Sequence, residues 1–343
     1  MPVTIYRDPS AFDALASEWN TLVDQNPALP PFMRREWLSL WWRIVGIGEL
    51  FLVAAREDSG RAIGIAPLYV DPSDGRRVVR NVGYGTPFYM DISDYLDFII
   101  APGREAEVYA AMLEALCGPD APDWDRIELC NLAEWSPLLT GFEAQAAQRG
   151  LKIEKSPLST CPALQLPDSF DAYLESLDAK QRREIKRKMR RAGGETEVTW
   201  YIVGPERDIE AEAGAFIEMM SISGKGKHDF LIPQMREMFL EGMKAAQANG
   251  WLQLAFLEVN GRKAAAYLNF DYHRRVWVFN SAIDAEASGG ISTGWVLLAN
   301  LIQWAIENKR EYYDFLRGEE EYKLQFGGKP TSIYKMTVRR AGE

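Results

Sequence analysis

The sequence predicts a fold of the α/β (α+β) class, with two similar domains that each hold a mixed, mostly antiparallel sheet flanked by helices. The chain has 343 residues, which exceeds the usual size of a domain with a single hydrophobic core and so indicates two domains. Both halves repeat one order of expected elements: helices, an antiparallel strand pair, a third strand, a helix and a further strand. Asn260-Gly261, between two apolar strands, is a strong hairpin signal.

The first domain is expected to span residues 1–160. Apolar residues at helical spacing predict helices over 9–23, 34–44, 104–117 and 137–150. Short apolar runs predict strands or extended segments over 50–56, 62–70, 77–82, 95–100 and 126–131. Trp37, Trp41 and Trp42 follow helical spacing, so we expect them in the core.

The second domain is expected to span residues 161–343, and the boundary to fall within 156–168, where Pro157, Pro162 and Pro167 interrupt regular structure. The same patterns predict helices over 170–191, 206–221, 233–249 and 294–308. They predict strands over 252–259, 262–272, 275–283, 312–316 and 332–339. Residues 223–228 and the stretch after 316 are expected to be loops.

The net charge, the apolar runs and the numbers of cysteines and histidines limit the partners and locations that we expect for this protein. A formal charge of −10 disfavours general affinity for DNA or anionic membranes, because phosphate groups are repelled at long range. The first residues show no signal peptide and no apolar run is long enough to span a bilayer, so we expect a cytoplasmic protein. Three widely spaced cysteines and two histidines form no ligand pattern, so we expect no metal site.

A small-residue turn at 288–294 lies between an apolar strand and an apolar helix. This order places glycines at a helix N-terminus, where free backbone N–H groups and the helix dipole favour an anion such as a pyrophosphate. Neither GxGxxG nor GxxxxGK[ST] is present, so the Rossmann and P-loop interpretations lose their main support. A purely structural turn that permits tight packing remains the alternative.

Four motifs carry a resemblance to a known family: Tyr313-Asp314-Phe315-Leu316-Arg317-Gly318, Tyr322-Lys323-Leu324-Gln325-Phe326-Gly327, the basic stretch 182–191 and Asp94-Tyr95-Leu96-Asp97-Phe98. With them the chain resembles the GNAT-fold acyltransferases, in particular the CelD-like branch named for cellulose biosynthesis, which is related to the FemABX peptidyltransferases. The resemblance covers nearly the whole chain. It implies tandem GNAT-like domains, with an acyl-CoA site in the second.

The resemblance further implies transfer of an acetyl or other acyl group from acyl-CoA to an amine, or less readily a hydroxyl. Its cofactor-binding residues would be Ile283, Gly289, Gly290, Ser292, Thr293 and Gly294. Backbone N–H groups over 281–284 could serve the thioester carbonyl, because direct acyl transfer needs positioning and oxyanion stabilisation. Ser292 and Thr293 could instead cap the helix.

Asp284 and Asp314 are the candidate general bases, since each lies at or beside the end of a strand flanking the expected cofactor site. Asp284 could instead initiate a turn, Asp314 could form a structural ion pair, and water could take the proton. Tyr322 could protonate the departing thiolate. Arg317 and Lys323 could contact the acceptor, or their loop could merely pack.

Arg182, Arg183 and Lys186 lie on the polar face of the basic helix and are candidate ligands for an acidic acceptor. The acceptor would be a small molecule or a cell-envelope or polysaccharide precursor. Two alternatives remain: an aminoacyl transferase that uses charged tRNA, and a non-catalytic protein of the same fold. The corresponding turn of the first half, 101–104, is short and not glycine-rich, so we expect that half to shape the acceptor site.

Overall fold

The computed structural model describes residues 1–73, 75–85, 91–194 and 197–340. Contacts divide the chain into two compact units: Met1–Ser159 with the C-terminal segment from Ser332 on, and Thr160–Thr331. The C-terminal segment groups with the first unit because β13 (Lys329–Arg340) pairs there with β6 (Arg126–Ala133). This differs from the 161–343 domain expected from sequence. The unit boundaries fall within β13 and within β7 (Leu151–Gln165).

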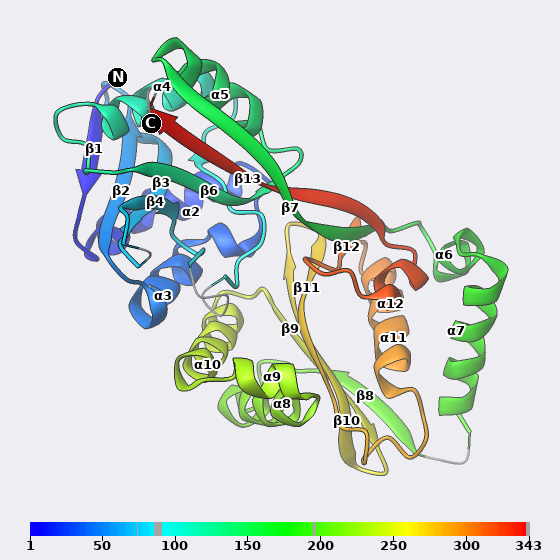
Figure 1. The fold of residues 1–343 in the computed structure, drawn as a ribbon. Helices are drawn as coiled ribbons and strands as arrows, with labels where there is room; N and C mark the ends of the chain where they lie inside the picture. The colour runs from blue at the N-terminus through cyan, green and yellow to red at the C-terminus, as the bar shows by residue number, and fades with distance from the viewer. Residues whose placement is uncertain (74, 86–90, 195–196, 341–343) are drawn as a thin grey trace. The chain divides into compact units, whose positions relative to one another are not determined.

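The first unit is a mixed sheet with helices packed on it (Figure 1). Its strand order is β1-β2-β3-β4-β6-β13, and β5 pairs with β3. The remaining elements are β1 (Val3–Tyr6), β2 (Glu49–Arg56), β3 (Ala62–Asp71), β4 (Val78–Asn81), β5 (Ile99–Ile100), α1 (Ala11–Ala14), α2 (Ala16–Asp24), the 3-10 helix η1 (Pro31–Met33), α3 (Arg35–Val45), α4 (Glu105–Cys117) and α5 (Leu138–Gln148). β4 and β6 are parallel, whereas the other neighbours with a described register are antiparallel.

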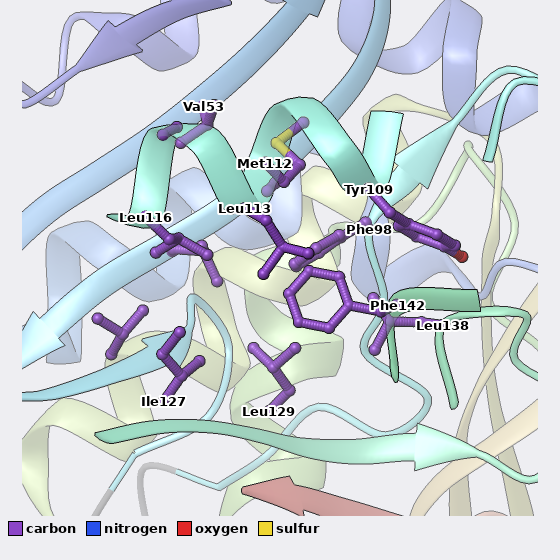
Figure 2. Close-up of a cluster of buried hydrophobic side chains, with 14 of the residues drawn as sticks. Val53, Phe98, Tyr109, Met112, Leu113, Leu116, Ile127, Leu129, Leu138 and Phe142 are labelled. Atoms are coloured by element: carbon purple, nitrogen blue, oxygen red, sulfur yellow. The ribbon is translucent and has the colours of Figure 1, made fainter. Parts of the chain in front are cut away.

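The core of the first unit lies between the sheet and helix α4. Met112, Leu113 and Leu116 follow Tyr109 at helical spacing, so α4 directs one apolar stripe toward the sheet (Figure 2). The ring of Phe142 from α5 meets Tyr109 edge-on, with ring centroids 5.9 Å apart. Burying each large apolar side chain contributes about 1.5–3 kcal/mol, so this stripe holds α4 on the sheet.

The second unit repeats this plan with the strand order β8-β9-β10-β11-β12-β7. Its elements are α6 (Phe170–Ser176), α7 (Ala179–Ala192), β8 (Val198–Ile202), α8 (Ile209–Ile222), α9 (Lys225–Phe230), α10 (Pro233–Ala248), β9 (Leu252–Val259), β10 (Arg262–Tyr272), β11 (Arg275–Ile283), α11 (Thr293–Glu307), β12 (Tyr312–Asp314) and α12 (Glu321–Gln325). β11 and β12 are parallel and joined by α11, as β4 and β6 are joined by α4. The expected tandem architecture is therefore confirmed.

Two of the three prolines near the boundary, Pro157 and Pro162, do not interrupt regular structure, contrary to the sequence expectation, whereas Pro167 follows the end of β7. β7 passes through Pro157 and Pro162 as one strand. Proline lacks an N–H group but keeps its carbonyl, and the Pro162 carbonyl accepts from the Phe315 N–H at 2.9 Å. Pairing with β12 begins at the next residue, Ala163. Proline fits such a strand wherever no N–H is required.

Four further expectations are corrected. The helix expected over 170–191 is two helices, because Leu177 is extended and the Asp178 carboxylate caps α7 through Lys180 N and Gln181 N, both at 2.9 Å. The loop expected over 223–228 contains the start of α9, and the stretch after 316 contains α12. The strand expected over 95–100 is reduced to β5, because Tyr95 has a φ of +55°.

Candidate functional site

The candidate site lies in the second unit, where β11 separates from β12. The two strands are paired only from Arg275 to Trp277, and β12 ends at Asp314 while β11 continues to Ile283. The register of β11 against β10 shifts between Leu268 and Asn269. On the side away from β10, β11 therefore has an edge beyond Trp277 that no strand of the described residues covers. We call the backbone groups of Ser281 and Ile283 on it the β11 edge.

The turn that follows β11 has the geometry of an anion site. Gly289 and Gly290 have φ values of +56° and +77°, which non-glycine residues rarely adopt. α11 then begins at Thr293. The amide groups of Gly290, Ser292 and Gly294 donate to no other residue among those described. Unpaired N–H groups at the start of a 15-residue helix favour a negative charge.

Arg191, which was not among the predicted site residues, lies beside this turn. A Cβ added at Gly290 would lie 3.6 Å from its Nη2 atom. The residue is the next to last of α7 and 99 positions from Gly290, so its sequence signal was only membership of the basic stretch. Its guanidinium adds a positive charge to the helix N-terminus.

The other expected cofactor residues take different positions. The Ser292 side chain is exposed and makes no capping bond, so its hydroxyl can serve a ligand. Thr293 is buried, and its hydroxyl lies 3.4 Å from the carbonyl oxygen of Ala264, so it faces the sheet. A Cβ on Gly294 would lie 2.8 Å from Cδ1 of Ile283, so glycine there lets the helix approach the strand end.

The Asp284 carboxylate organises the turn. Its Oδ1 atom accepts from Glu286 N at 2.9 Å and from Ala287 N at 3.1 Å, and Arg262 lies 3.8 Å from Oδ2. This is an Asx turn, the alternative role considered for this residue. The assignment of Asp284 as a base stays a prediction.

Asp314 lies elsewhere along the strand. It is opposite Trp277, whereas Asp284 directly follows β11, seven residues after Trp277, which corresponds to about 23 Å of extended chain at ~3.3 Å per residue. The Asp314 side chain has no exposed surface, and it pairs with Arg275 at 3.3 Å and accepts from Leu316 N at 3.0 Å. One small acceptor cannot contact both carboxylates.

Side chains from the α8–α9 junction occupy the β11 edge. The Ser223 hydroxyl accepts from Ile283 N at 2.7 Å and lies 3.1 Å from the Ile283 carbonyl oxygen. The Lys227 ammonium donates to the carbonyl oxygen of Ser281, and Ser281 N donates to Asn280 Oδ1 at 2.9 Å. Two of the N–H groups expected to serve a thioester carbonyl are thus already bonded to side chains. Neither Ser223 nor Lys227 was predicted as a site residue.

Tyr322 on α12 packs against the core cluster of the second unit that includes Tyr267. Burial raises the pKa of its phenol above the ordinary value, and the nearby Glu320 carboxylate adds to the effect. Burial raises the pKa of Tyr267, and Tyr322 makes the next largest contribution to the same effect. Tyr267 is directly opposite Ser281 in the β10–β11 ladder. The Tyr322 phenol therefore stays protonated, as a proton donor must.

Lys323 has a structural position. It is buried, and its ammonium donates to the carbonyl oxygens of Leu316 at 3.2 Å and Arg317 at 2.8 Å and pairs with Glu320 at 2.9 Å. Arg317 is partly exposed on the loop that these bonds hold. Lys323 thus orders the loop before α12, and acceptor contact by either residue stays a prediction.

The basic face of α7 borders a cavity of about 380 Å³. The lining residues are Lys180, Gln181, Arg183, Glu184, Arg187, Lys188, Trp295 and Gln325. Of the three predicted ligands only Arg183 lines it, whereas Arg182 is partly exposed and Lys186 exposed outside it. Glu184 pairs with Arg187 at 2.7 Å, and the Lys188 ammonium lies 3.8 Å from the centre of the Trp295 ring.

The first unit lacks an equivalent anion site at the start of α4. Glu105 and Glu107 lie in the first turn, and Gly103 N donates to Glu105 Oε1 at 3.1 Å. Arg104 pairs with Glu57 at 2.8 Å and also with Glu107. Carboxylates already neutralise this helix N-terminus, so a phosphate would be repelled there.

Within the described ranges, no group of His, Cys, Asp or Glu side chains could hold a metal ion. Cys117 is exposed, while Cys130 and Cys161 are buried, and none of the three forms a disulfide within the described ranges. In the same ranges, no helix has the length and apolar character needed to cross a membrane.

Residues 179–324 match the family model described as an acetyltransferase (GNAT) domain. A search of curated protein sequences finds no match. Among solved structures, FemX is similar with a TM-score of 0.66 and 11% identity, over 98% of this chain and 97% of FemX. The C-terminal domain of a putative lysylphosphatidylglycerol synthetase from Agrobacterium fabrum gives a TM-score of 0.58 at 13% identity, over 96% and 92%.

L-PGS from Bacillus licheniformis is similar with a TM-score of 0.57 and 13% identity, over 98% of this chain and 93% of L-PGS. At these identities the likeness concerns the fold, and the likeness to FemX agrees with the expected relation to the FemABX proteins. The chain therefore has a tandem GNAT fold, and the stretch that matches the GNAT acetyltransferase model lies within its second unit.

Proposed function

We propose that this protein is an acyltransferase that moves an acetyl or other acyl group from acyl-CoA to an amine of a polar acceptor, less readily to a hydroxyl. One observation carries the proposal: the glycine turn with its unpaired N–H groups and Arg191 lies directly after the strand whose edge is left open beyond Trp277. The turn would hold the pyrophosphate, and the thioester would lie toward the β11 edge. The match to the GNAT acetyltransferase model supports this donor.

In the proposed reaction the neutral amine attacks the thioester carbonyl, a C–N bond forms and the C–S bond breaks. Tyr322 would donate its proton to the departing thiolate, since its phenol is protonated and acts on Tyr267, which is opposite Ser281 in the β10–β11 ladder. The acceptor would lose its proton to water or to Asp284. Backbone N–H groups of the β11 edge would receive the oxyanion once the bonds of Ser223 and Asn280 are exchanged.

The acceptor would be a small molecule or a cell-envelope or polysaccharide precursor, in keeping with the resemblance to CelD-like proteins. Arg183 and the other cations of the α7 cavity would bind acidic groups on it. Arg182, Lys186, Arg317 and Lys323 stay predicted contacts whose contribution mutation can measure.

Gly290→Asp is expected to weaken the binding of acetyl-CoA at least about tenfold, because it places a carboxylate against the incoming pyrophosphate. Calorimetric titration measures this directly. Gly290→Ala is the control: it introduces positive-φ strain without charge, and its Cβ would lie 3.6 Å from Nη2 of Arg191. The proposal fails if the wild-type protein shows no saturable binding of any short-chain acyl-CoA.

A second candidate is an aminoacyl transferase that uses charged tRNA, which the exposed basic face of α7 favours. For this function, replacing Arg182, Arg183 and Lys186 by glutamine should lower tRNA affinity. It should also reduce the slope of log binding constant against log salt concentration by up to about 3. Removing the same number of charges at Arg149, Lys152 and Lys155 of the first unit is the control. No salt-sensitive tRNA binding by the wild type would exclude this candidate.

A non-catalytic role is distinguished by the same titrations followed by assays. Normal binding of acyl-CoA with no turnover across a broad panel of amines would show that the fold is retained without the chemistry.

A further inference from the structure

Lys227 is a partly buried cation at the β11 edge. Its ammonium donates to the carbonyl oxygen of Ser281. No carboxylate lies within ion-pair distance of it among the described residues. Glu320, on the loop before α12, is the charged group that acts on it, and that carboxylate is already bonded to Lys323 at 2.9 Å.

The chain places this amine at the edge by specific local structure. Gly224, with a φ of +156°, ends the turn after α8, and α9 begins at Lys225. The preceding residue, Ser223, is anchored to both backbone groups of Ile283. Two side chains from one short segment therefore reach two successive outward-facing residues of β11, and only one of them carries an amine.

Burial also changes the chemistry of this amine. It lowers the pKa of the Lys227 ammonium to about 8, against the opposing effect of the Glu320 carboxylate. At pH 7.5 the Lys227 amine would then be neutral in about a quarter of the protein molecules, whereas an ordinary lysine is neutral in about 0.1% of them. Only the neutral amine has the free electron pair that attacks a carbonyl.

We propose that Lys227 is an acylation site of this protein, whose ε-amine takes the acyl group from a thioester when no external amine is bound. The position of Lys227 at the β11 edge carries this inference, and its link to acyl-CoA rests on the proposed function. In the step, the amine nitrogen bonds to the thioester carbonyl carbon and the C–S bond breaks. The nitrogen loses one proton and the thiolate gains one, which gives an ε-N-acyl lysine and a free thiol.

Acylation would change the edge itself. The amide N–H of the product can still donate to Ser281, but the charge is lost and the acyl group occupies the space next to the strand. An external amine would then be excluded from this position. Lys227 is therefore expected to be a competitor of the acceptor as well as a neighbour of it.

The test uses two donors and mass spectrometry of the intact, purified protein. A small thioester, S-acetyl-N-acetylcysteamine, reports the reactivity of the amine without any nucleotide site. We expect it to label Lys227 roughly tenfold to twentyfold faster than Lys225 at pH 7.5. This ratio allows for the lower nucleophilicity of a less basic amine, with the same dependence of nucleophilicity on pKa as thiols show. The labelling rate of Lys227 should level off above about pH 8. Lys225 is the internal control, because it is exposed and lies on the same helix.

Acetyl-CoA then separates this inference from the proposed function. Faster, saturable labelling of Lys227 by acetyl-CoA than by the small thioester supports both. Preferential labelling of Lys227 by the small thioester but not by acetyl-CoA supports the acylation site and contradicts the proposed acyl-CoA site. Equal labelling of Lys227 and Lys225 by the small thioester overturns the acylation site, even if acetyl-CoA binds in the calorimeter.

Two variants distinguish the loss of the Lys227 amine from a change in folding. Lys227→Arg keeps a cationic donor for Ser281 and should lose the fast label while Lys225 still reacts. Ser223→Ala removes the bonds to Ile283 but keeps the amine, so Lys227 should still be labelled faster than Lys225.

Discussion

Replacing Asp314 by alanine is expected to destabilise the second unit by about 3–5 kcal/mol, because it leaves the Arg275 guanidinium without its buried partner. Arg275 is only 18% exposed and cannot easily turn to water. The same change removes the acceptor of the Leu316 N–H group, which is buried. Urea unfolding followed by tryptophan fluorescence would measure the loss, since the Trp277 indole is buried within 4.8 Å of the Arg275 guanidinium.

Asp314→Asn is the matched control for this prediction. It keeps the volume of the side chain and an oxygen that can accept from Leu316 N, and it removes only the charge. We expect a cost of about 1–2 kcal/mol, with amide exchange at Leu316 still slow. An alanine variant that unfolds at the same urea concentration as the wild type would contradict the structural role. An asparagine variant that is stable but loses turnover would instead favour Asp314 as the base.

The strands around the candidate site could be predicted because their signals are local. The expected bounds of β9, β10 and β11 agree with the structure residue for residue. Asn260 and Gly261 both have positive φ, +50° and +75°, as the favoured two-residue hairpin turn requires. Alternating apolar residues and turn residues are read from neighbouring positions, so one sequence is enough to find them.

The candidate site itself was predicted only in part, because its contacts join distant positions. The turn with Gly289 and Gly290 has a local signature and was predicted as an anion site. Its partner Arg191 is about 100 residues away, and the bonds from Ser223 and Lys227 to β11 join residues 54 to 60 apart. Those contacts depend on how helices pack on the sheet, which no single window of sequence shows.

Register decides a question that sequence left open. Asp284 and Asp314 both lie at or beside the end of an expected strand and looked equivalent in sequence. The parallel pairing of β11 and β12 sets Asp314 opposite Trp277, and seven residues, or about 23 Å of extended chain, separate Trp277 from Asp284. The prolines of β7 were misjudged for a related reason. Whether proline ends a strand depends on whether its N–H is needed, and that is known only once the neighbouring strand is in place.

Asp97→Asn is expected to stabilise the first unit at neutral pH and to leave its stability in acid unchanged. Asp97 follows the positive-φ residue Tyr95, and its carboxylate accepts from the Ser136 hydroxyl at 2.5 Å and from Phe98 N at 2.7 Å. Burial raises its pKa from 3.8 to about 6, although both hydrogen bonds act in the opposite direction. The folded protein thus favours the protonated carboxyl more than the unfolded chain does.

The sign of the pH effect follows from this order of pKa values. Between about pH 4 and pH 6 the folded state binds more protons than the unfolded state, so the free energy of unfolding falls as the pH rises through this window. The full shift corresponds to about 3 kcal/mol, and the partial exposure of Asp97 reduces the expected loss to about 2 kcal/mol. Asparagine cannot ionise and can occupy the same hydrogen-bonding position, so the variant should avoid that loss.

Thermal unfolding of both proteins from pH 4 to pH 8 would measure the difference. The two curves should coincide near pH 4 and separate through pH 6, with the variant more stable by about 2 kcal/mol at pH 7.5. Asp58→Asn, at an exposed carboxylate of the first unit, controls for the general effect of lost charge and should run parallel to the wild type. If Asp97→Asn were less stable at every pH, the ionised carboxylate would be the form that the fold needs, and Asp97 would contribute to the first unit as an anion.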